Sequence, residues 1–174
     1  SGWKARSKPI STPRGGCSRW YAFCRCGVEV VPSAILFACT LNAVRSPMAA
    51  ALMRHLTANG IHVESAGVRA GALDPLAVEA MEEIGLEIGK HKPRCFEDLE
   101  DGSFDLVITL SPEAQHKAVE LTRTAATEVE YWPTMDPTAV EGSREQRLAA
   151  YRSVRDQLLD RLKRRFMAPK AADT

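Results

Sequence analysis

The residues Ala34-Ile35-Leu36-Phe37-Ala38 form a continuous apolar run whose length is typical of a β-strand. A strand that is apolar at every position is buried on both faces, as strands in the middle of a parallel sheet are. Cys39 to Arg45 follow directly, and after them Ser46 can cap a helix while Pro47 fits its first turn. The order of strand, short loop and helix is therefore the first constraint on the fold.

The rest of the chain repeats this alternation of strand and helix. Further strands are predicted at Ile61 to Glu64, Phe104 to Leu110 and Thr127 to Trp132. Helices are predicted from Ser46 to about Ala58, from Asp74-Pro75 to near Gly85, from Ser111-Pro112 onward, and from Ser143, which forms a capping box with Gln146. This order predicts an α/β domain with a mostly parallel sheet.

The first 32 residues differ in composition from the rest, because six Lys and Arg side chains stand against Glu29 alone. We predict three parts: a basic, disordered N-terminal extension over residues 1–32, an α/β domain over residues 33–167, and a tail over residues 168–174. A targeting peptide and a tag remnant are the other interpretations of the extension.

Charge and cysteine usage exclude several classes of partner. The formal net charge is +1, so the chain offers no overall basic field for nucleic acid, and no apolar run approaches the roughly 18 residues that span a bilayer. The five cysteines include no Cys-x-x-Cys pair and no His at metal-ligand spacing, which argues against a metal site. Free thiols favour a reducing compartment, and we expect the cytoplasm, although one bridge among Cys17, Cys24 and Cys26 stays open.

The loop between the first strand and the first helix is the candidate functional site. Ligands of open α/β sheets gather at the carboxyl ends of strands, where helix N-termini supply partial positive charge. Backbone N–H groups turned inward there form an anion-binding nest, so a tetrahedral oxyanion such as phosphate is the expected guest. The residues of this predicted phosphate-binding loop are Thr40, Leu41, Asn42, Ala43, Val44 and Arg45.

Three side chains around the loop suggest nucleophilic chemistry on that phosphate. The field of the helix N-terminus and a nearby cation favour the thiolate form of Cys39, which is the nucleophilic form. Arg45 can bind two phosphate oxygens with its planar fork, a geometry that Lys does not offer. Ser46 can cap the helix and also donate its hydroxyl to the sulfur of Cys39, and Asn42 suits a left-handed position in the loop.

The segment Cys39-Thr40-Leu41-Asn42-Ala43-Val44-Arg45-Ser46-Pro47-Met48-Ala49 resembles the signature of low-molecular-weight protein tyrosine phosphatases. The resemblance covers about Ser33 to Phe166. Other motifs follow in the family's order: Ser65-Ala66-Gly67, His91, Phe104-Asp105-Leu106 and Asp136-Pro137.

This resemblance implies a small four-stranded parallel sheet flanked by helices on both faces, with the phosphate-binding loop between the first strand and the first helix. It also implies phosphate monoester hydrolysis through a phosphocysteine on Cys39, with Asp136 as general acid and then base. Ser65 and His91 are expected to support the loop. The expected substrates are a phosphorylated protein or a small aryl phosphate, without cofactor or metal, while the oligomeric state stays open.

Simpler interpretations of these residues stay open beside the functional ones. Asp136 can serve only as a helix cap before Pro137. Ser65 before Ala-Gly can be an ordinary turn residue, and His91 can be a structural or surface histidine.

The chain also departs from the family's pattern. Leu41 stands where the family usually has Gly, and Val44 replaces a second loop cysteine, which leaves Cys39 more open to irreversible oxidation. Thr138 follows Asp136-Pro137 in place of an aromatic residue, and Ala66 to Asp74 contains no aromatic. Because such rings stack on phosphotyrosine, we expect activity on small aryl phosphates and less efficient hydrolysis of phosphoproteins.

Two other functions compete with this prediction. Thioredoxin-coupled arsenate reductases share the fold and the loop, but they use two further cysteines after the third strand, where this chain has Ser111 and Ala118. Cys95 could substitute for one of them, although it precedes that strand. A non-catalytic phosphate-binding module is the second alternative, and the joint presence of Cys39, Arg45 and Asp136 argues against it.

Overall fold

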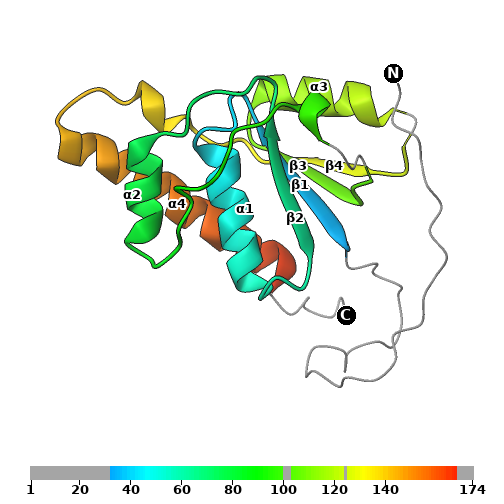
Figure 1. The fold of residues 1–174 in the computed structure, drawn as a ribbon, viewed down its shortest axis with the longest axis horizontal. Helices are drawn as coiled ribbons and strands as arrows, with labels where there is room; N and C mark the ends of the chain where they lie inside the picture. The colour runs from blue at the N-terminus through cyan, green and yellow to red at the C-terminus, as the bar shows by residue number, and fades with distance from the viewer. Residues whose placement is uncertain (1–31, 100–102, 124, 168–174) are drawn as a thin grey trace, which may run out of the picture.

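The computed structural model describes residues 32–99, 103–123 and 125–167, so the extension predicted before residue 32 and the tail predicted after residue 167 lie outside it. Four strands alternate with four helices along the chain (Figure 1). The strands are β1 (Ala34–Cys39), β2 (His62–Gly67), β3 (Leu106–Thr109) and β4 (Glu128–Tyr131). The helices are α1 (Arg45–Leu56), α2 (Pro75–Glu82), α3 (Pro112–Thr122) and α4 (Arg144–Phe166), with 3-10 turns η1 (Phe96–Asp98) and η2 (Pro137–Ala139).

The strands form one parallel sheet in the order β2-β1-β3-β4, which confirms the predicted fold class. In the centre of this sheet, Phe37 of β1 pairs with Ser65 on one side and with Ile108 on the other. Four successive residues of β1, from Ile35 to Ala38, have no exposed surface. The unbroken apolar run therefore marks a central strand that is covered on both faces.

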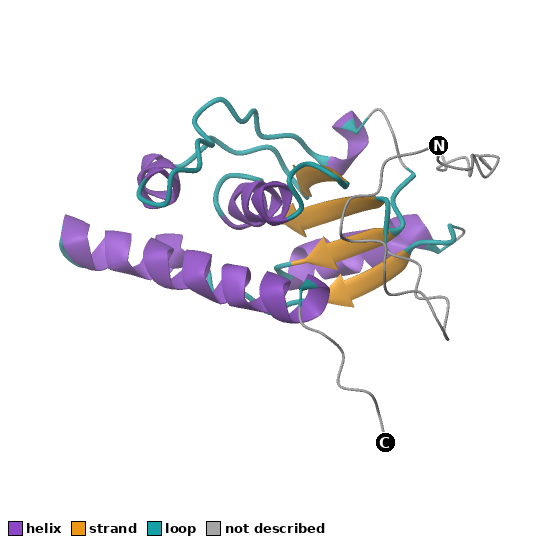
Figure 2. Ribbon diagram, turned by 90° about the horizontal axis from the view of Figure 1, so that it is seen from below, coloured by secondary structure: helices purple, strands orange, loops and turns teal. Residues whose placement is uncertain are grey.

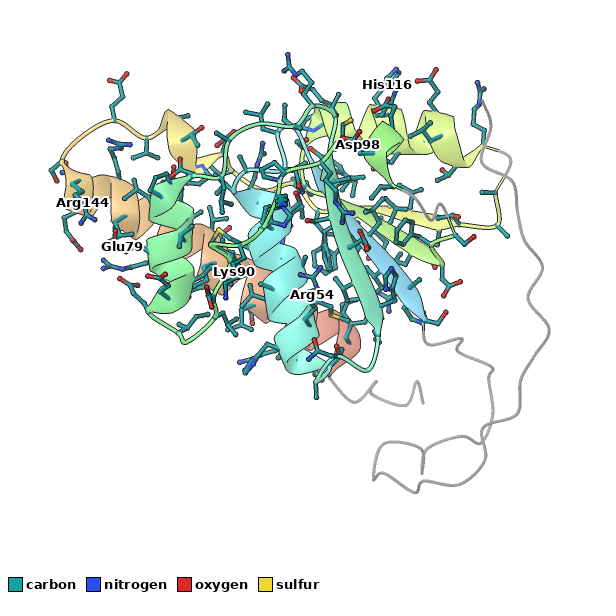
Figure 3. All side chains as sticks on the ribbon, in the orientation of Figure 1. Arg54, Glu79, Lys90, Asp98, His116 and Arg144 are labelled. Carbon is teal, nitrogen blue, oxygen red and sulfur yellow. The ribbon has the colours of Figure 1, made fainter. Side chains whose placement is uncertain are left out.

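Helices cover both faces of the sheet, as predicted (Figure 2). On one face α1, α2 and α4 enclose the larger apolar core, which includes Phe37, Met48, Met81 and Tyr151. On the other face α3 and η1 cover a smaller core that includes Leu36, Phe96 and Val107. Ion pairs also join α2 to α4, and the pair of Glu79 and Arg144 lies at one end of the contact (Figure 3).

Side-chain caps define most of the helix starts. The predicted capping box of Ser143 and Gln146 is confirmed, and Asp74 and Ser111 accept the N–H groups at the starts of α2 and α3. The cap predicted for Ser46 is wrong, because α1 begins at Arg45 and its N-cap position is Val44, which makes no side-chain cap. The hydroxyl of Ser46 is engaged with the loop instead.

Neither a membrane span nor a metal cluster is found in the described part of the chain. None of its helices is both long and apolar enough to cross a bilayer. Its His, Cys, Asp and Glu side chains nowhere gather in threes at positions that could hold a metal ion.

Candidate active site

The loop that joins β1 to α1 follows the strand from which the next two strands, β2 and β3, are added on opposite sides of the sheet. β1 pairs with β2 on one side and with β3 on the other, so the carboxyl end of β1 is the switch point of the strand order. Such a position opens a crevice outside the strand ends, next to the N-terminus of the following helix. Cys39 is the last residue of β1, and Arg45 is the first of α1.

A second segment fixes the orientation of the loop's peptide groups. The N–H groups of Val68, Arg69, Gly71 and Asp74 donate to loop carbonyls at 2.8 to 3.2 Å. The accepting carbonyls belong to Cys39, Thr40, Leu41 and Ala43. The N–H groups of loop residues 41–44 donate to no acceptor within the described residues. The segment therefore holds the carbonyls on the outside and leaves N–H groups for an anion.

The thiol of Cys39 lies against the hydroxyl of Ser46. Their Sγ and Oγ atoms are 3.0 Å apart, and both residues are almost completely buried. Asn42 Nδ2 donates to the same hydroxyl oxygen at 2.9 Å, so the hydroxyl proton of Ser46 is available to the sulfur or to the carbonyl of Ala66 at 3.3 Å. A thiolate at Cys39 can therefore accept a hydrogen bond from Ser46.

Asn42 links this pair to a second set of residues behind the loop. It adopts a left-handed conformation with φ of 51°, which Asn tolerates better than most residues. Its Oδ1 accepts from the backbone N–H of Arg94 at 3.0 Å and lies 2.7 Å from Nε2 of His91, so that nitrogen is the donor. Burial, with the positive charges of Arg54 and Arg94, holds the pKa of His91 below its usual value.

Arg45 is held at the mouth of the loop by several acceptors. Its Nη1 donates to the carbonyl of Thr134 at 3.1 Å, and its Nη2 lies 3.4 Å from Thr40 Oγ1 and 3.2 Å from Asp136 Oδ2. Asp136 reaches this place from the loop after β4, where its other oxygen accepts from the N–H and the hydroxyl of Thr138. Residues that are 91 positions apart in the sequence thus form an ion pair at the residue that follows the loop.

Of the side chains predicted to act in the site or to support it, the structure brings together all except Ser65. Cys39, Asn42 and Ser46 form one hydrogen-bonded group at the loop, His91 joins it through Asn42, and Asp136 joins Arg45. Ser65 does not join them. Its hydroxyl is buried in β2 without a hydrogen-bond partner within the described residues, so the expected supporting contact is absent.

Several contacting groups were missed by the sequence analysis. Arg94 and Thr134 act through backbone atoms, which no residue pattern could indicate. Ser111 caps α3 as predicted, but the hydrogen bond that it accepts from the hydroxyl of Thr40 at 3.2 Å was not predicted. Thr138 was noted only as a missing aromatic, although its side chain contacts Asp136 directly.

The rim of the site carries two exposed aliphatic side chains. Leu41 of the loop is 44% exposed, and Met135, which precedes Asp136, is 54% exposed. The departure from glycine at Leu41 is accommodated because its side chain lies at the surface, beside the backbone of Gly71.

Known proteins resemble the chain over this whole region. The family model described as low molecular weight phosphotyrosine protein phosphatase matches residues 34–171. An arsenate reductase of Shouchella clausii is 37% identical over 131 residues, which are 75% of this chain and 92% of that protein.

Solved structures of phosphatases and of arsenate reductases are similar to this chain in fold. The structure of an arsenate reductase in the phosphate binding state has a TM-score of 0.60 and 28% identity to this chain, and the match covers 76% of this chain and 95% of that one. The YwlE arginine phosphatase from Geobacillus stearothermophilus has a TM-score of 0.64 and 27% identity, covering 76% and 90%. The chain belongs to the low molecular weight phosphotyrosine protein phosphatase family.

Proposed function

We propose that this chain hydrolyses phosphate monoesters through a phosphocysteine on Cys39. The observation that carries the proposal is the convergence of a buried thiol, a guanidinium and a carboxylate on one loop whose N–H groups face no protein acceptor in the described residues. This set supplies a nucleophile, a clamp for the oxyanion and a proton donor. The proposed substrates are a phosphorylated protein or a small aryl phosphate.

In the first step the thiolate of Cys39 attacks phosphorus, and the bond from phosphorus to the leaving oxygen breaks. The leaving oxygen takes the bond's electron pair and a proton from Asp136, so an alcohol departs and the carboxylate remains. Arg45 and the loop N–H groups bind the phosphoryl oxygens throughout. Ser46 stabilises the sulfur before attack through its hydroxyl.

In the second step water attacks the phosphocysteine. The carboxylate of Asp136 takes a proton from this water, the sulfur–phosphorus bond breaks, and its electron pair returns to the sulfur. Phosphate leaves, and both Asp136 and Cys39 regain their starting protonation states. The cycle consumes one ester and one water and needs no metal or redox partner.

Arsenate reduction is the second candidate, because curated relatives at 37% and 33% identity are named arsenate reductases. That chemistry needs thiols that resolve the arsenylated cysteine by disulfide exchange. Ser111 caps α3 and Ala118 is buried within it, at the two positions where those enzymes carry relay cysteines. Among the described residues the cysteines are Cys39 and Cys95.

Cys95 is poorly placed to replace a relay thiol. Cys39 pairs with Gly67, and Gly67 in turn bridges to Cys95, so the two cysteines are separated by two steps across the sheet. Two inter-strand spacings place their Cα atoms on the order of 9 to 10 Å apart. A disulfide needs Cα atoms closer than about 7 Å, so the pair cannot bond without backbone movement.

The deciding experiment measures phosphate release from p-nitrophenyl phosphate by the full chain and by the Cys39→Ser and Asp136→Asn variants. Hydrolysis that Cys39→Ser abolishes supports the proposal. Turnover of arsenate with thioredoxin and its reductase, without ester hydrolysis, would establish the reductase instead. Tight phosphate binding without release of product would establish a non-catalytic binding module. Phosphotyrosine and phosphoarginine peptides belong in the same assay, since two of the similar structures are of YwlE arginine phosphatases.

A further inference from the structure

We infer that Thr138 is a positioning residue for the general acid, and that it determines which oxygen of Asp136 delivers the proton. The inference rests on the proposed function, because it concerns the acid of that reaction. Thr138 stands where the family resemblance leads one to expect an aromatic residue, and its hydroxyl gives Asp136 a donor that an aromatic hydrocarbon side chain would lack.

The contacts of Asp136 divide cleanly between its two oxygens. Oδ1 accepts from the backbone N–H of Thr138 at 3.0 Å and from the hydroxyl of Thr138 at 2.7 Å. Oδ2 accepts from Arg45 at 3.2 Å. One oxygen is therefore fixed by the turn, and the other faces the phosphate clamp.

A second Asp-Pro turn in the same chain shows that capping does not need a hydroxyl. Asp74 precedes Pro75, and its capping oxygen Oδ1 accepts from the backbone N–H of Leu76 at 2.8 Å, while the hydroxyl of Tyr151 donates to the other oxygen, Oδ2, at 2.7 Å. Both turns place the residue after proline within reach of the carboxylate, but only Thr138 can add a side-chain donor. The hydroxyl bond at Asp136 is thus additional to the cap.

This second donor affects where a proton can reside. An oxygen that already accepts two hydrogen bonds is a poor site for a proton, because one donor would have to turn away. When Asp136 is protonated, the proton therefore belongs on Oδ2. When a phosphate ester occupies the loop and engages Arg45, Oδ2 is the oxygen beside the site, so the proton is already directed toward the leaving oxygen.

The proton transfer is the one in the first step of the proposed reaction, from Asp136 to the leaving oxygen. The O–H bond of Oδ2 breaks as the phosphorus–oxygen bond breaks, and the departing oxygen gains the proton. Thr138 takes no part in this exchange, since its hydroxyl keeps its own proton throughout. It acts only by holding Oδ1.

The test compares Thr138→Val, which keeps the side-chain shape but removes the hydroxyl, with Thr138→Ser, which keeps the hydroxyl. The measured quantity is kcat/KM for phenyl phosphate and for p-nitrophenyl phosphate, since this ratio reports the step in which the leaving group departs. Phenolate is the poorer leaving group and depends more on proton donation.

We expect Thr138→Val to lower kcat/KM for phenyl phosphate by about fivefold, the loss of a net hydrogen bond of about 1 kcal/mol. We expect a smaller loss for p-nitrophenyl phosphate and near wild-type values for Thr138→Ser. Thr57→Val is the matched control, because its hydroxyl bonds the carbonyl of Met53 at the opposite end of α1 from the loop.

Each outcome decides the question. Equal losses on both substrates, or a Thr138→Ser variant as impaired as Thr138→Val, would overturn the positioning role, as would unchanged kinetics. A wild-type protein that hydrolyses neither ester would instead overturn the proposed function. Because Thr138 is exposed, the substitution to valine leaves the core untouched.

Discussion

Asp136 Oδ2 lies 3.2 Å from Nη2 of Arg45, so the proposed acid and the proposed phosphate clamp are paired with each other. Arg45 is nearly buried, whereas the side chain of Asp136 is 43% exposed. A phosphate bound as proposed would have to compete with this carboxylate for the guanidinium. We therefore expect the ion pair to weaken anion binding.

We expect Asp136→Asn to bind inorganic phosphate and vanadate more tightly while losing activity. Removal of a partly exposed ion pair should tighten binding by about two- to fivefold. Loss of the acid should lower kcat/KM for phenyl phosphate by about 100-fold or more. Competitive inhibition and isothermal titration measure the two effects.

The matched control is Asp160→Asn, which removes another Asp–Arg pair at the far end of α4. It should change neither quantity. Weaker phosphate binding by Asp136→Asn would show that the carboxylate assists the anion site and does not compete with it.

Gly67 is the position where a methyl group should damage the loop most. A Cβ there would lie 2.4 Å from the carbonyl oxygen of Arg69 and 2.8 Å from the N of Asn42. All of its close neighbours are backbone atoms, so no side chain can turn aside. We expect Gly67→Ala to lower the free energy of unfolding by about 1–3 kcal/mol and to reduce phosphate binding.

Urea unfolding and phosphate titration test this expectation. Gly89→Ala is the control, because a Cβ at Gly89 would meet only Val78 Cγ1 at an ordinary 3.7 Å. A Gly67→Ala protein as stable as the control variant would mean that the loop can move away from β2.

Much of the fold was predictable because local signals and burial agree. The apolar run from Ala34 to Ala38 located the central strand, and the capping pair Ser143 and Gln146 located the start of α4. The start of α1 was misplaced, since a serine before proline is typical of a cap, yet Ser46 is buried against Cys39. Tertiary contact overrode the local preference there.

The residues of the candidate site also fall into a group that local sequence predicts and a group that it does not. Cys39 ends β1, and Arg45 and Ser46 begin α1 on the other side of one short loop, so their proximity follows from sequence spacing once the strand and helix are placed. Asp136 and His91 come from distant segments, and only a family resemblance could connect them with the loop. The contact expected of Ser65 failed, because a strand residue's neighbours depend on packing that the sequence does not state.

The lowered pKa of His91 predicts a stability that depends on pH. Since the folded protein resists protonation of this imidazole, the unfolded chain binds more protons as the pH falls through about 6.5, the ordinary value for histidine. The free energy of unfolding should therefore decrease below that pH and be fully retained above it. In His91→Gln, which keeps an N–H donor but cannot titrate, the decrease should be shallower.

Urea midpoints measured between pH 7.5 and 5.5 provide the comparison. His116→Gln serves as control, because His116 is exposed on α3 (Figure 3) and should leave the wild-type slope unchanged. A His91→Gln slope equal to that of the wild type would assign the pH dependence to other groups.

Cys95 should be an unreactive thiol although it is only partly buried. Its Sγ donates to Asp98 Oδ2 at 2.9 Å, and this carboxylate raises the pKa of Cys95. We expect iodoacetamide to modify Cys95 slowly near neutral pH, as followed by peptide mass spectrometry. Asp98→Asn should accelerate the modification by about two- to fivefold, because the thiolate loses a negative neighbour.

Glu87→Gln is the control, because Glu87 pairs with Lys90 and makes no contact with Cys95 within the described residues. This variant should leave the rate of Cys95 modification unchanged. Cys95→Ser should also hydrolyse p-nitrophenyl phosphate at the wild-type rate, because the proposed cycle uses one sulfur only. A Cys95 that reacts as fast in the wild type as in Asp98→Asn would show that the carboxylate does not protect it. Such a thiol would again be a candidate resolving group, although Gly67 still separates Cys39 from Cys95 across the sheet.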